Sequence, residues 1–375
     1  WASPFGAAML RTKLPEAKIA ESEMDIREVQ PGAPFTVGPF EVEMVHMTHS
    51  IPEANLLRLT CSAGTVVHSG DWKMDPAPLV GEETDAARLK AIGEAGIIGM
   101  VCDSTNVFEE GHSGSEADVR ERLTEVIGRY EGRVAVACFA SNVARVDSIA
   151  RAARANDRDV ALVGRSLWRV TDCARAAGYM TDIPPFLRED EAGYLPDDRL
   201  LYIMTGSQGE PRAALSRVAA DSHPNVVLGE GDVAIFSSKI IPGNERSVGR
   251  LTNNLARQSV EILTEKDEPV HVSGHPAQEE LRRLYQLLKP GVVVPQHGEM
   301  RHLLEHARLA PEWGADQAVV TENGQIVRFT PGTPEVVAEV ETGILGLEPG
   351  GPVPFDSDLL RRRRRVIWSG AATAT

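Results

Sequence analysis

Residues 292–299 read Val292-Val293-Val294-Pro295-Gln296-His297-Gly298-Glu299, and the fold class follows from this stretch. Its β-branched run predicts a buried strand that ends in an imidazole, a glycine and a carboxylate. Apolar residues at helical spacing come next and predict a helix over residues 300–310. A strand, a polar loop and a helix form the repeating unit of α/β folds, which bind ligands at the carboxyl ends of their strands.

A second unit of the same kind lies 22 residues earlier in the chain. Residues 270–272 are a short strand-like run, Ser273-Gly274-His275-Pro276 follows it, and leucines at helical spacing predict the next helix. His275 and His297 are therefore both expected at the ends of strands. A single histidine in such a place is more often an ordinary loop residue than a ligand. Two in register, with further imidazoles and carboxylates upstream, favour a metal site.

Apolar periodicity also divides the chain into domains. Alternating residues predict antiparallel strands in the first part, and a later alternation of helices and strands predicts a parallel sheet with right-handed crossovers. We expect a sheet domain at 1–115, a parallel α/β insert at 116–265, the rest of the sheet domain at 266–332 and a linker rich in proline, glycine and charge at 333–375. A hairpin is expected from 318–320 and 325–329, turning on Glu322-Asn323-Gly324.

The composition sets limits on the class of protein. With 42% hydrophobic residues the chain can fill a core, and no apolar run approaches the roughly 18 residues of a membrane span. The four cysteines form no CxxC pair, so reduced thiols in a cytoplasmic protein are expected rather than a thiolate zinc site. A net charge of −15 gives nucleic-acid binding no support, although a local basic or metal-bearing groove could override it.

Metal-capable side chains gather at the predicted strand ends. They are His49, Asp71, Asp103, His275 and His297. Nitrogen and carboxylate ligands without sulfur suit zinc or manganese in a hydrolytic site. Asp71 is the candidate to bridge two cations about 3.5–4 Å apart, although a turn or helix-cap role explains that residue alone equally well. His46 and His68 fit the faces of strands better than a metal site.

Two further segments have the pattern of phosphate-binding loops. Residues 205–211 and Ala140-Ser141-Asn142 each leave a strand and enter a helix, which would place hydroxyl and amide donors at a helix N-terminus. Ser141 and Ser207 are therefore candidate substrate-binding residues, with simple helix capping as the alternative. GxxxxGK[ST], GxGxxG and GxSxG do not occur, which argues against nucleotide cofactors and serine hydrolases.

Taken together, these segments resemble the ribonuclease J family, in which a metallo-β-lactamase fold carries an inserted β-CASP domain. The resemblance covers nearly the whole chain. It rests on eight short motifs in order: His49-Ser50-Ile51-Pro52, Ser69-Gly70-Asp71-Trp72-Lys73, Asp103-Ser104-Thr105-Asn106, Phe139-Ala140-Ser141-Asn142, Thr205-Gly206-Ser207-Gln208-Gly209-Glu210-Pro211, Ile241-Pro242-Gly243-Asn244-Glu245, His271-Val272-Ser273-Gly274-His275 and Pro295-Gln296-His297-Gly298-Glu299.

The resemblance implies a fold and a site. The fold is an αββα sandwich, incomplete at its N-terminus, with a parallel α/β β-CASP insert. His49, Asp71 and His297 are implied zinc ligands, with Asp71 bridging two ions and acting in catalysis; manganese is the alternative metal. The loop His271-Val272-Ser273-Gly274-His275 is implied to hold an RNA phosphate, and His275 to protonate the leaving group.

The chain also departs from the family pattern. The family carries a His-x-His-x-Asp-His cluster that would precede Trp1, and this motif occurs nowhere in the 375 residues. A C-terminal domain would follow the run Arg361–Arg365, which we interpret as a solvated linker without a site role. We therefore expect the chain to be an internal piece of a longer protein.

The leading functional hypothesis is a zinc-dependent ribonuclease of RNA processing and decay, including rRNA processing and mRNA decay. It would act as a 5′→3′ exonuclease and an endonuclease on single-stranded RNA with a 5′-monophosphate, as a cytoplasmic homodimer or homotetramer. One alternative is an RNA-binding or assembly protein that lacks its metals. The other is a small-molecule hydrolase such as a lactonase, against which the long insert argues, because such an enzyme needs no polymer channel.

Overall fold

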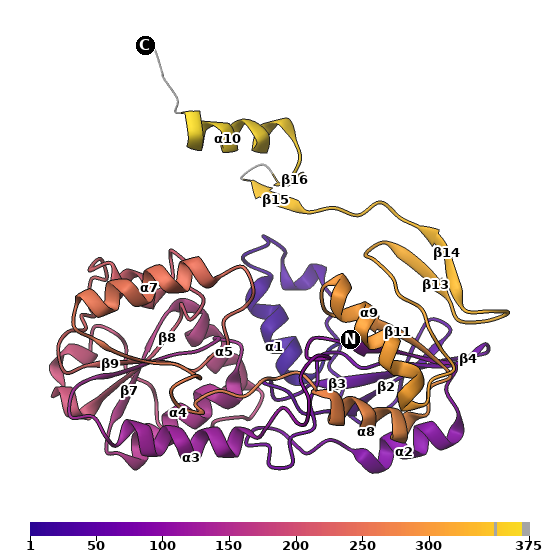
Figure 1. Cartoon of the computed structure of the whole chain (residues 1–375), viewed down its shortest axis with the longest axis horizontal. Helices are drawn as coiled ribbons and strands as arrows, with labels where there is room; N and C mark the ends of the chain where they lie inside the picture. Colours follow the sequence, from indigo (N-terminus) through magenta and orange to yellow (C-terminus); the bar gives the residue numbers. More distant parts are fainter. Residues whose placement is uncertain (349–350, 370–375) are drawn as a thin grey trace.

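The computed structural model describes residues 1–348 and 351–369, and its main body has two lobes that lie side by side (Figure 1). The first lobe holds a seven-stranded sheet in the order β1-β2-β3-β4-β5-β11-β12. The first four strands pair antiparallel, whereas β5, β11 and β12 extend the sheet with parallel pairs. These strands are β1 (Phe35–Val37), β2 (Phe40–His46), β3 (Asn55–Cys61), β4 (Gly64–His68), β5 (Gly99–Asp103), β11 (Val292–Gln296) and β12 (Gln317–Ala318).

Helices cover this sheet and bury its apolar residues. α2 (Ala86–Ala95) and α8 (Gln278–Leu288) pack against each other, and their apolar faces join the same core as Trp72, which is fully buried. α9 (Met300–Leu309) packs on β11 and continues into η4 (Ala310–Trp313). His297 follows β11 and His275 precedes α8. Because β11 and α8 share one hydrophobic core, this core fixes where both histidine loops begin.

The second lobe is built from the chain between β5 and α8. Its sheet has five parallel strands in the order β10-β9-β6-β8-β7. The strands are β6 (Val134–Ala137), β7 (Asp159–Val163), β8 (Leu200–Met204), β9 (Val233–Phe236) and β10 (Glu261–Leu263). The helices are α3 (Glu116–Ile127), α4 (Val143–Ala155), α5 (Arg165–Ala176), α6 (Ala214–Ala219) and α7 (Glu245–Arg257), with short turns η2 (Ala192–Tyr194) and η3 (Asp197–Arg199). α1 (Pro4–Lys13), which η1 (Glu21–Glu23) follows, packs on α5.

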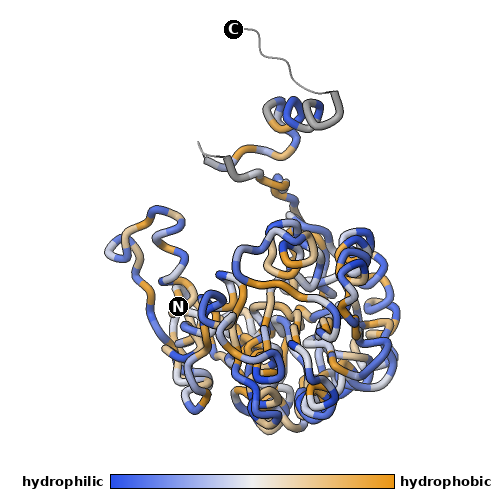
Figure 2. Tube along the Cα trace, turned by 90° about the vertical axis from the view of Figure 1, so that its left-hand side faces the viewer, coloured by the Kyte–Doolittle hydropathy of each residue, from blue (hydrophilic) through white to orange (hydrophobic). Residues whose placement is uncertain are grey.

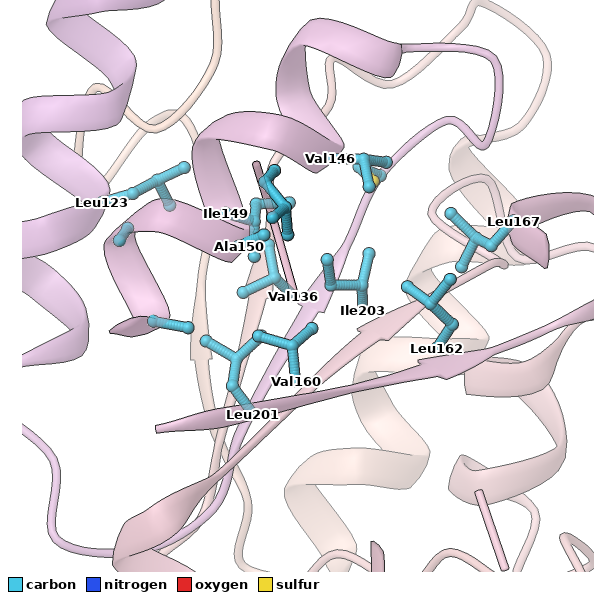
Figure 3. Packing of buried hydrophobic residues seen from close by; sticks show 14 of the residues in the cluster. Leu123, Val136, Val146, Ile149, Ala150, Val160, Leu162, Leu167, Leu201 and Ile203 are labelled. Atoms are coloured by element: carbon cyan, nitrogen blue, oxygen red, sulfur yellow. The ribbon is translucent and has the colours of Figure 1, made fainter. Parts of the chain in front are cut away.

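Both faces of this parallel sheet are buried, which explains its continuous apolar strands. Side chains of α3 and α4 cover one face, where Leu123 and Ile149 meet Val136 and Ile203 (Figure 3). Each such aliphatic side chain contributes about 1.5–3 kcal/mol by leaving water. Ser115 and Asn142 cap the two helices through their side chains, as these residue types do at helix starts. Hydrophobic segments run through the interior of the molecule (Figure 2).

Three predictions differ from the structure, and the first is the strand expected at 270–272, where the chain is irregular. The expected hairpin of 318–320 with 325–329 is wrong, because Ala318 pairs with β11 while β13 (Gln325–Arg328) pairs with β14 (Glu335–Glu339). β14 lies in the stretch expected to be a linker, so the expected boundary after residue 332 separates two paired strands. In the insert, α7 ends at Arg257, and residues 261–263 form the edge strand β10.

The loop that begins at residue 205 extends to residue 213, and the helix after it, α6, begins only at Ala214. This loop therefore does not lead straight into a helix N-terminus, as the phosphate-loop interpretation of it required. Beyond β14, the strands β15 (Leu345–Glu348) and β16 (Gly351–Pro354) and the helix α10 (Asp358–Ser369) extend away from both lobes (Figure 1). The arginine run 361–365 lies within α10.

A buried arginine joins the two lobes. Arg145 on α4 is fully buried and binds Glu116 at the start of α3 through two hydrogen bonds of 3.0 and 2.8 Å. It also donates to the Ser237 and Val270 carbonyls and to Nδ1 of His271. A buried charge is tolerated only when it is paired and its donors are satisfied. Arg145 thereby ties the end of β9 and the chain that leaves the insert to the insert's first helices.

Two observations concern the class of protein. Within the described ranges, every helix is too short or too polar to span a bilayer. All four cysteines are free, and Cys102, Cys138 and Cys173 are buried.

Candidate active site

The sheet register brings the predicted site residues together. β5 and β11 are neighbouring parallel strands, and Asp103 at the end of β5 lies opposite Gln296 at the end of β11. The loop after β5 therefore begins beside His297. Thr105 Oγ1 donates to the His297 carbonyl at 3.2 Å, and the Asn106 side chain donates to Ser273 Oγ and to the His275 carbonyl. The loop 103–106 thus holds both histidine loops, a role that the sequence analysis did not assign to Thr105 or Asn106.

His49 approaches the second histidine loop from the other side of the site. Its Nδ1 lies 2.5 Å from the Gly274 carbonyl, and because a carbonyl can only accept, Nδ1 carries the proton. The lone pair is then on Nε2, the arrangement found in metal-binding histidines. Gly274 is required here, because a Cβ at this position would stand 2.6 Å from His49 Cε1. Burial and the neighbouring His275 lower the pKa of His49, so its ring is neutral at pH 7.

His297 and Asp71 form a second pair. His297 Nδ1 lies 2.7 Å from Asp71 Oδ1, and this hydrogen bond raises the pKa of His297. Burial opposes ionisation of Asp71, but the hydrogen bond from His297 and the charges of the surrounding histidines keep the pKa of its carboxyl below the ordinary value. His297 has φ of +57°, in the left-handed region that costs a non-glycine residue free energy and is concentrated at functional sites.

His275 and Asp103 form a dyad at the centre. His275 Nδ1 donates to Asp103 Oδ2 at 2.7 Å, while Thr105 donates twice to the other oxygen of the same buried carboxylate. Three of about four acceptor positions on Asp103 are therefore in use. The His275 ring lies between those of His49 and His297, with both ring centroids 5.1 Å away. Because Nδ1–H is bonded to Asp103, Nε2 is the ring nitrogen of His275 that remains available for a metal or a substrate.

Two overlapping groups of residues place three ligand atoms within 4.8 Å of one another. They are His49, Asp71 and His275, and Asp103, His275 and His297. Imidazole nitrogen and carboxylate oxygen without sulfur fit zinc or manganese. Asp103 is the poorest ligand of the set because its oxygens are already engaged, whereas Asp71 is partly open to solvent beside both His297 and the first group. The donor set therefore fits a metal centre, and Asp71 is its most open carboxylate.

A buried row of three hydrogen-bonded side chains, Ser104, His306 and Tyr285, lies next to this centre. Ser104 Oγ and Tyr285 OH each lie 2.8 Å from a ring nitrogen of His306, which is fully buried in the core of the first lobe. Burial lowers the pKa of His306 to about 4, so the ring is neutral at pH 7. One hydroxyl donates to it and the other accepts from it. This row fixes Ser104, the neighbour of Asp103.

The stability of the protein should fall in mild acid because of His306. Its pKa in the folded chain lies below the unfolded value near 6.5, so its contribution is full above pH 6.5 and is lost as the pH falls toward 4. That loss amounts to about 3 kcal/mol. In urea unfolding at several pH values, His306→Gln should lose less stability between pH 6.5 and 4 than the wild type. The exposed His112→Gln serves as control and should follow the wild type; parallel curves for His306→Gln would contradict this role.

The candidate phosphate-binding residues are in different settings. Ser273 Oγ accepts hydrogen bonds from Asn106 and from the His275 amide, which leaves its own O–H to donate to an anion. Val272 packs against the insert's core. His271 Nδ1 accepts from Arg145, and burial lowers the pKa of His271 to about 3, so this ring is neutral.

The two candidate serines of the insert differ in their position relative to the site. Ser141 lines a cavity of about 480 Å³ together with His49 and Asp71. Ser207 is buried, and no hydrogen bond joins it to the histidines within the described residues.

Comparisons with known proteins agree with this geometry. Two family models match: the β-CASP domain of ribonuclease J over residues 131–255, and the Zn-dependent metallo-hydrolase RNA specificity domain over residues 260–319. Among proteins called ribonuclease J, that of Sinorhizobium meliloti is 44% identical over 99% of this chain. The protein of Mycolicibacterium smegmatis is 40% identical over 100% of this chain and 67% of its own length. The chain belongs to the ribonuclease J family.

Membership of the ribonuclease J family confirms the expected fold class, a metallo-β-lactamase fold with a parallel β-CASP insert. Within the described residues, the metallo-β-lactamase part contributes the seven-stranded mixed sheet and its helices. The chain spans 65% of the length of the ribonuclease J of S. meliloti and 65% of that of Thermus thermophilus, which is 35% identical. A crystal structure of a protein of unknown function from Enterococcus faecalis shares the fold, with a TM-score of 0.56, 15% identity and coverage of 86% of this chain and 73% of that one.

Proposed function

We propose that this chain carries the catalytic centre of a metal-dependent ribonuclease that acts on single-stranded RNA. It would work as a 5′→3′ exonuclease on RNA with a 5′-monophosphate and as an endonuclease. The observation that carries the proposal is the meeting of three histidines and two carboxylates from five loops of the first lobe, those after β2, β4, β5 and β11 and the loop before α8, which also holds the proposed phosphate donors. The centre lies where the insert meets the first lobe, since Ser141 of the insert shares its cavity. A polymer can lie along such a junction, which a small-molecule hydrolase would not need.

His49, Asp71 and His297 would hold the metal, with Asp71 facing two ions. Two zinc ions are proposed, and manganese is the alternative with the same ligand chemistry. Such ions activate water at neutral pH and stabilise charge on a phosphoryl oxygen. The remaining steps belong to the protein: Ser273 and the amide of Gly274 bind the phosphate, and His275, protonated at both ring nitrogens, gives the Nε2 proton to the leaving oxygen and takes another from solvent. Asp103 keeps the His275 ring in the required orientation.

The test is a cleavage assay on the full chain after chelation and after return of zinc or manganese. RNA with a 5′-monophosphate should yield mononucleotides from its 5′ end together with internal fragments, and only when metal is present. RNA with a 5′-hydroxyl should give the internal fragments alone. Binding of RNA without cleavage at any metal concentration would favour the RNA-binding alternative, and hydrolysis of a lactone but not of RNA would favour the small-molecule hydrolase.

We further propose a homodimer or homotetramer in the cytoplasm. Exposed apolar residues support association, because they gather in the segment that extends from the lobes: Val336, Val337, Val340, Ile344, Leu345 and Phe355. Four free cysteines support a reducing compartment.

A further inference from the structure

A second cavity, of about 940 Å³, lies in the insert and, among the described residues, shares no lining residue with the candidate active site. Gly164, which follows β7, and Thr205, which follows β8, line it together with the first turn of α5. Glu16, which follows α1, lines it as well and forms an ion pair with Arg169 of α5. The cavity therefore lies at the carboxyl end of two parallel strands, the setting in which α/β sheets bind ligands.

The lining of this cavity is basic, although the whole chain carries a net charge of −15. Five arginines line it against three glutamates: Arg165, Arg169, Arg188, Arg212 and Arg217 against Glu16, Glu189 and Glu210. Arg169 and Arg188 have carboxylate partners. Over residues 1–348 and 351–369, no carboxylate oxygen lies within 4.0 Å of a side-chain nitrogen of Arg165, Arg212 or Arg217, and all three are exposed. Three guanidinium groups are thus free to bind an anion.

The position of the cavity relative to the histidine cluster indicates which anion. In the strand order β6-β8-β7, the loop after β6 carries Ser141, which lines the cavity of His49 and Asp71. The loops after β8 and β7 carry Thr205 and Gly164 of the basic cavity. Neighbouring strands are about 4.8 Å apart, so the ends of β6, β8 and β7, and the loops that follow them, succeed one another along one edge of the sheet. A strand with a phosphate at the first site can reach the second within a few nucleotides.

We propose that the arginine-lined cavity binds backbone phosphates of the RNA strand whose reactive phosphate lies at the histidine cluster. The assignment rests on the proposed function, since it takes RNA as the substrate. The guanidinium fork matches two phosphate oxygens, and it keeps its charge at every physiological pH. Trp168 also lines the cavity and provides an aromatic surface of the kind on which bases stack. A volume of about 940 Å³ exceeds the need of one free phosphate and suits an extended nucleotide segment.

The experiment measures RNA binding by the full chain in chelator, so that cleavage plays no part. The probes are 5′-phosphorylated, fluorescent RNAs of about twelve nucleotides and of two nucleotides. Arg212→Gln/Arg217→Gln should weaken binding of the long RNA about ten-fold and reduce the salt dependence of log K by about 1.4, the value for two phosphates of a single strand. Dinucleotide binding should change less than two-fold. Both side chains are exposed, and circular dichroism would confirm that the variant folds.

The matched control is Arg282→Gln/Arg283→Gln, which removes the same charge from the exposed face of α8 and should leave both affinities unchanged. Equal losses in the two double variants, or an unchanged affinity for the long RNA, would overturn the proposal. Binding of AMP that depends on Arg212 and Arg217, with no added affinity for the long RNA, would assign the cavity to a free nucleotide and overturn the RNA assignment. Because binding is measured without metal, the role of this cavity can be decided even for a chain that fails to cleave RNA.

Discussion

Replacing His275 with alanine should lower RNA cleavage by about 10²–10⁴-fold, the usual range for losing a positioned proton donor, while the metal content stays unchanged. The reason lies in the dyad with Asp103. The carboxylate is fully buried and holds His275 Nδ1–H, so that Nε2 is directed toward His49 and His297. Asp103→Asn should lower cleavage in the same direction, because a neutral amide no longer stabilises the imidazolium form of His275, the form that keeps Nδ1–H bonded and has a proton on Nε2 to give.

Metal content and the rate on a 5′-monophosphorylated RNA should be measured on the same preparation of each variant. His112→Ala, at an exposed position, is the control and should keep both. The structure makes this a sharp test, because His275 belongs to both groups that could hold a metal ion. If the metal leaves together with the activity, His275 is a ligand and the division of work between the two histidine loops is wrong.

Much of the fold could be predicted from local patterns. The apolar runs at 134–138 and 200–204 are buried on both faces of a parallel sheet, and such strands show no alternation because helices cover both sides. The position of His297 after the strand 292–296 is also local, because the run ends where the chain turns into α9. The strand assignments placed both Asp103 and His297 at strand ends, but the parallel pairing of β5 with β11, which brings them together, is shown only by the structure.

The rest depends on contacts between distant parts of the chain. His49 and Gly274 are 225 residues apart, and only the folded chain shows that a carbonyl fixes the ring. Arg145 has the local pattern of a helix residue, yet it is buried between the lobes with five hydrogen-bond partners in the two domains. The expected hairpin failed for a similar reason: Glu322-Asn323-Gly324 is a good turn, but β11 offered the strand before it a parallel partner.

The arginine-lined cavity of the insert is a functional feature that the sequence alone did not reveal. Arg165 lies in a different segment from Arg212 and Arg217, and none of the three was a candidate from the sequence. What distinguishes them is that they line one cavity together and have no carboxylate partner within the described residues, in a chain with more acidic than basic side chains. That property depends on the arrangement of the whole surface, so a pattern of neighbours along the chain cannot show it.

Replacing Asp71 with alanine should damage the enzyme more than replacing His49 with alanine. Asp71 belongs to one ligand group with His49 and His275, and its carboxylate is also bonded to His297 of the other group. A carboxylate between two cations lowers the cost of holding them a few ångströms apart. Asp71→Ala should therefore lose both ions, and cleavage should fall by about 10³-fold or more, because water activation and charge stabilisation disappear together. His49→Ala should keep one ion and a measurable rate.

The comparison needs metal analysis after dialysis and rates at saturating zinc for both variants. Unequal metal content is the decisive result, because a change in rate alone could come from a displaced loop: His49 also holds the Gly274 carbonyl. His49→Gln is useful here, since its amide can donate to that carbonyl while binding zinc poorly. If Asp71→Ala and His49→Ala keep the same number of ions and the same residual activity, Asp71 does not bridge. The hydrogen bond between Asp71 and His297 would then mark Asp71 as the residue that orients this histidine, and the second ion would need ligands other than those proposed.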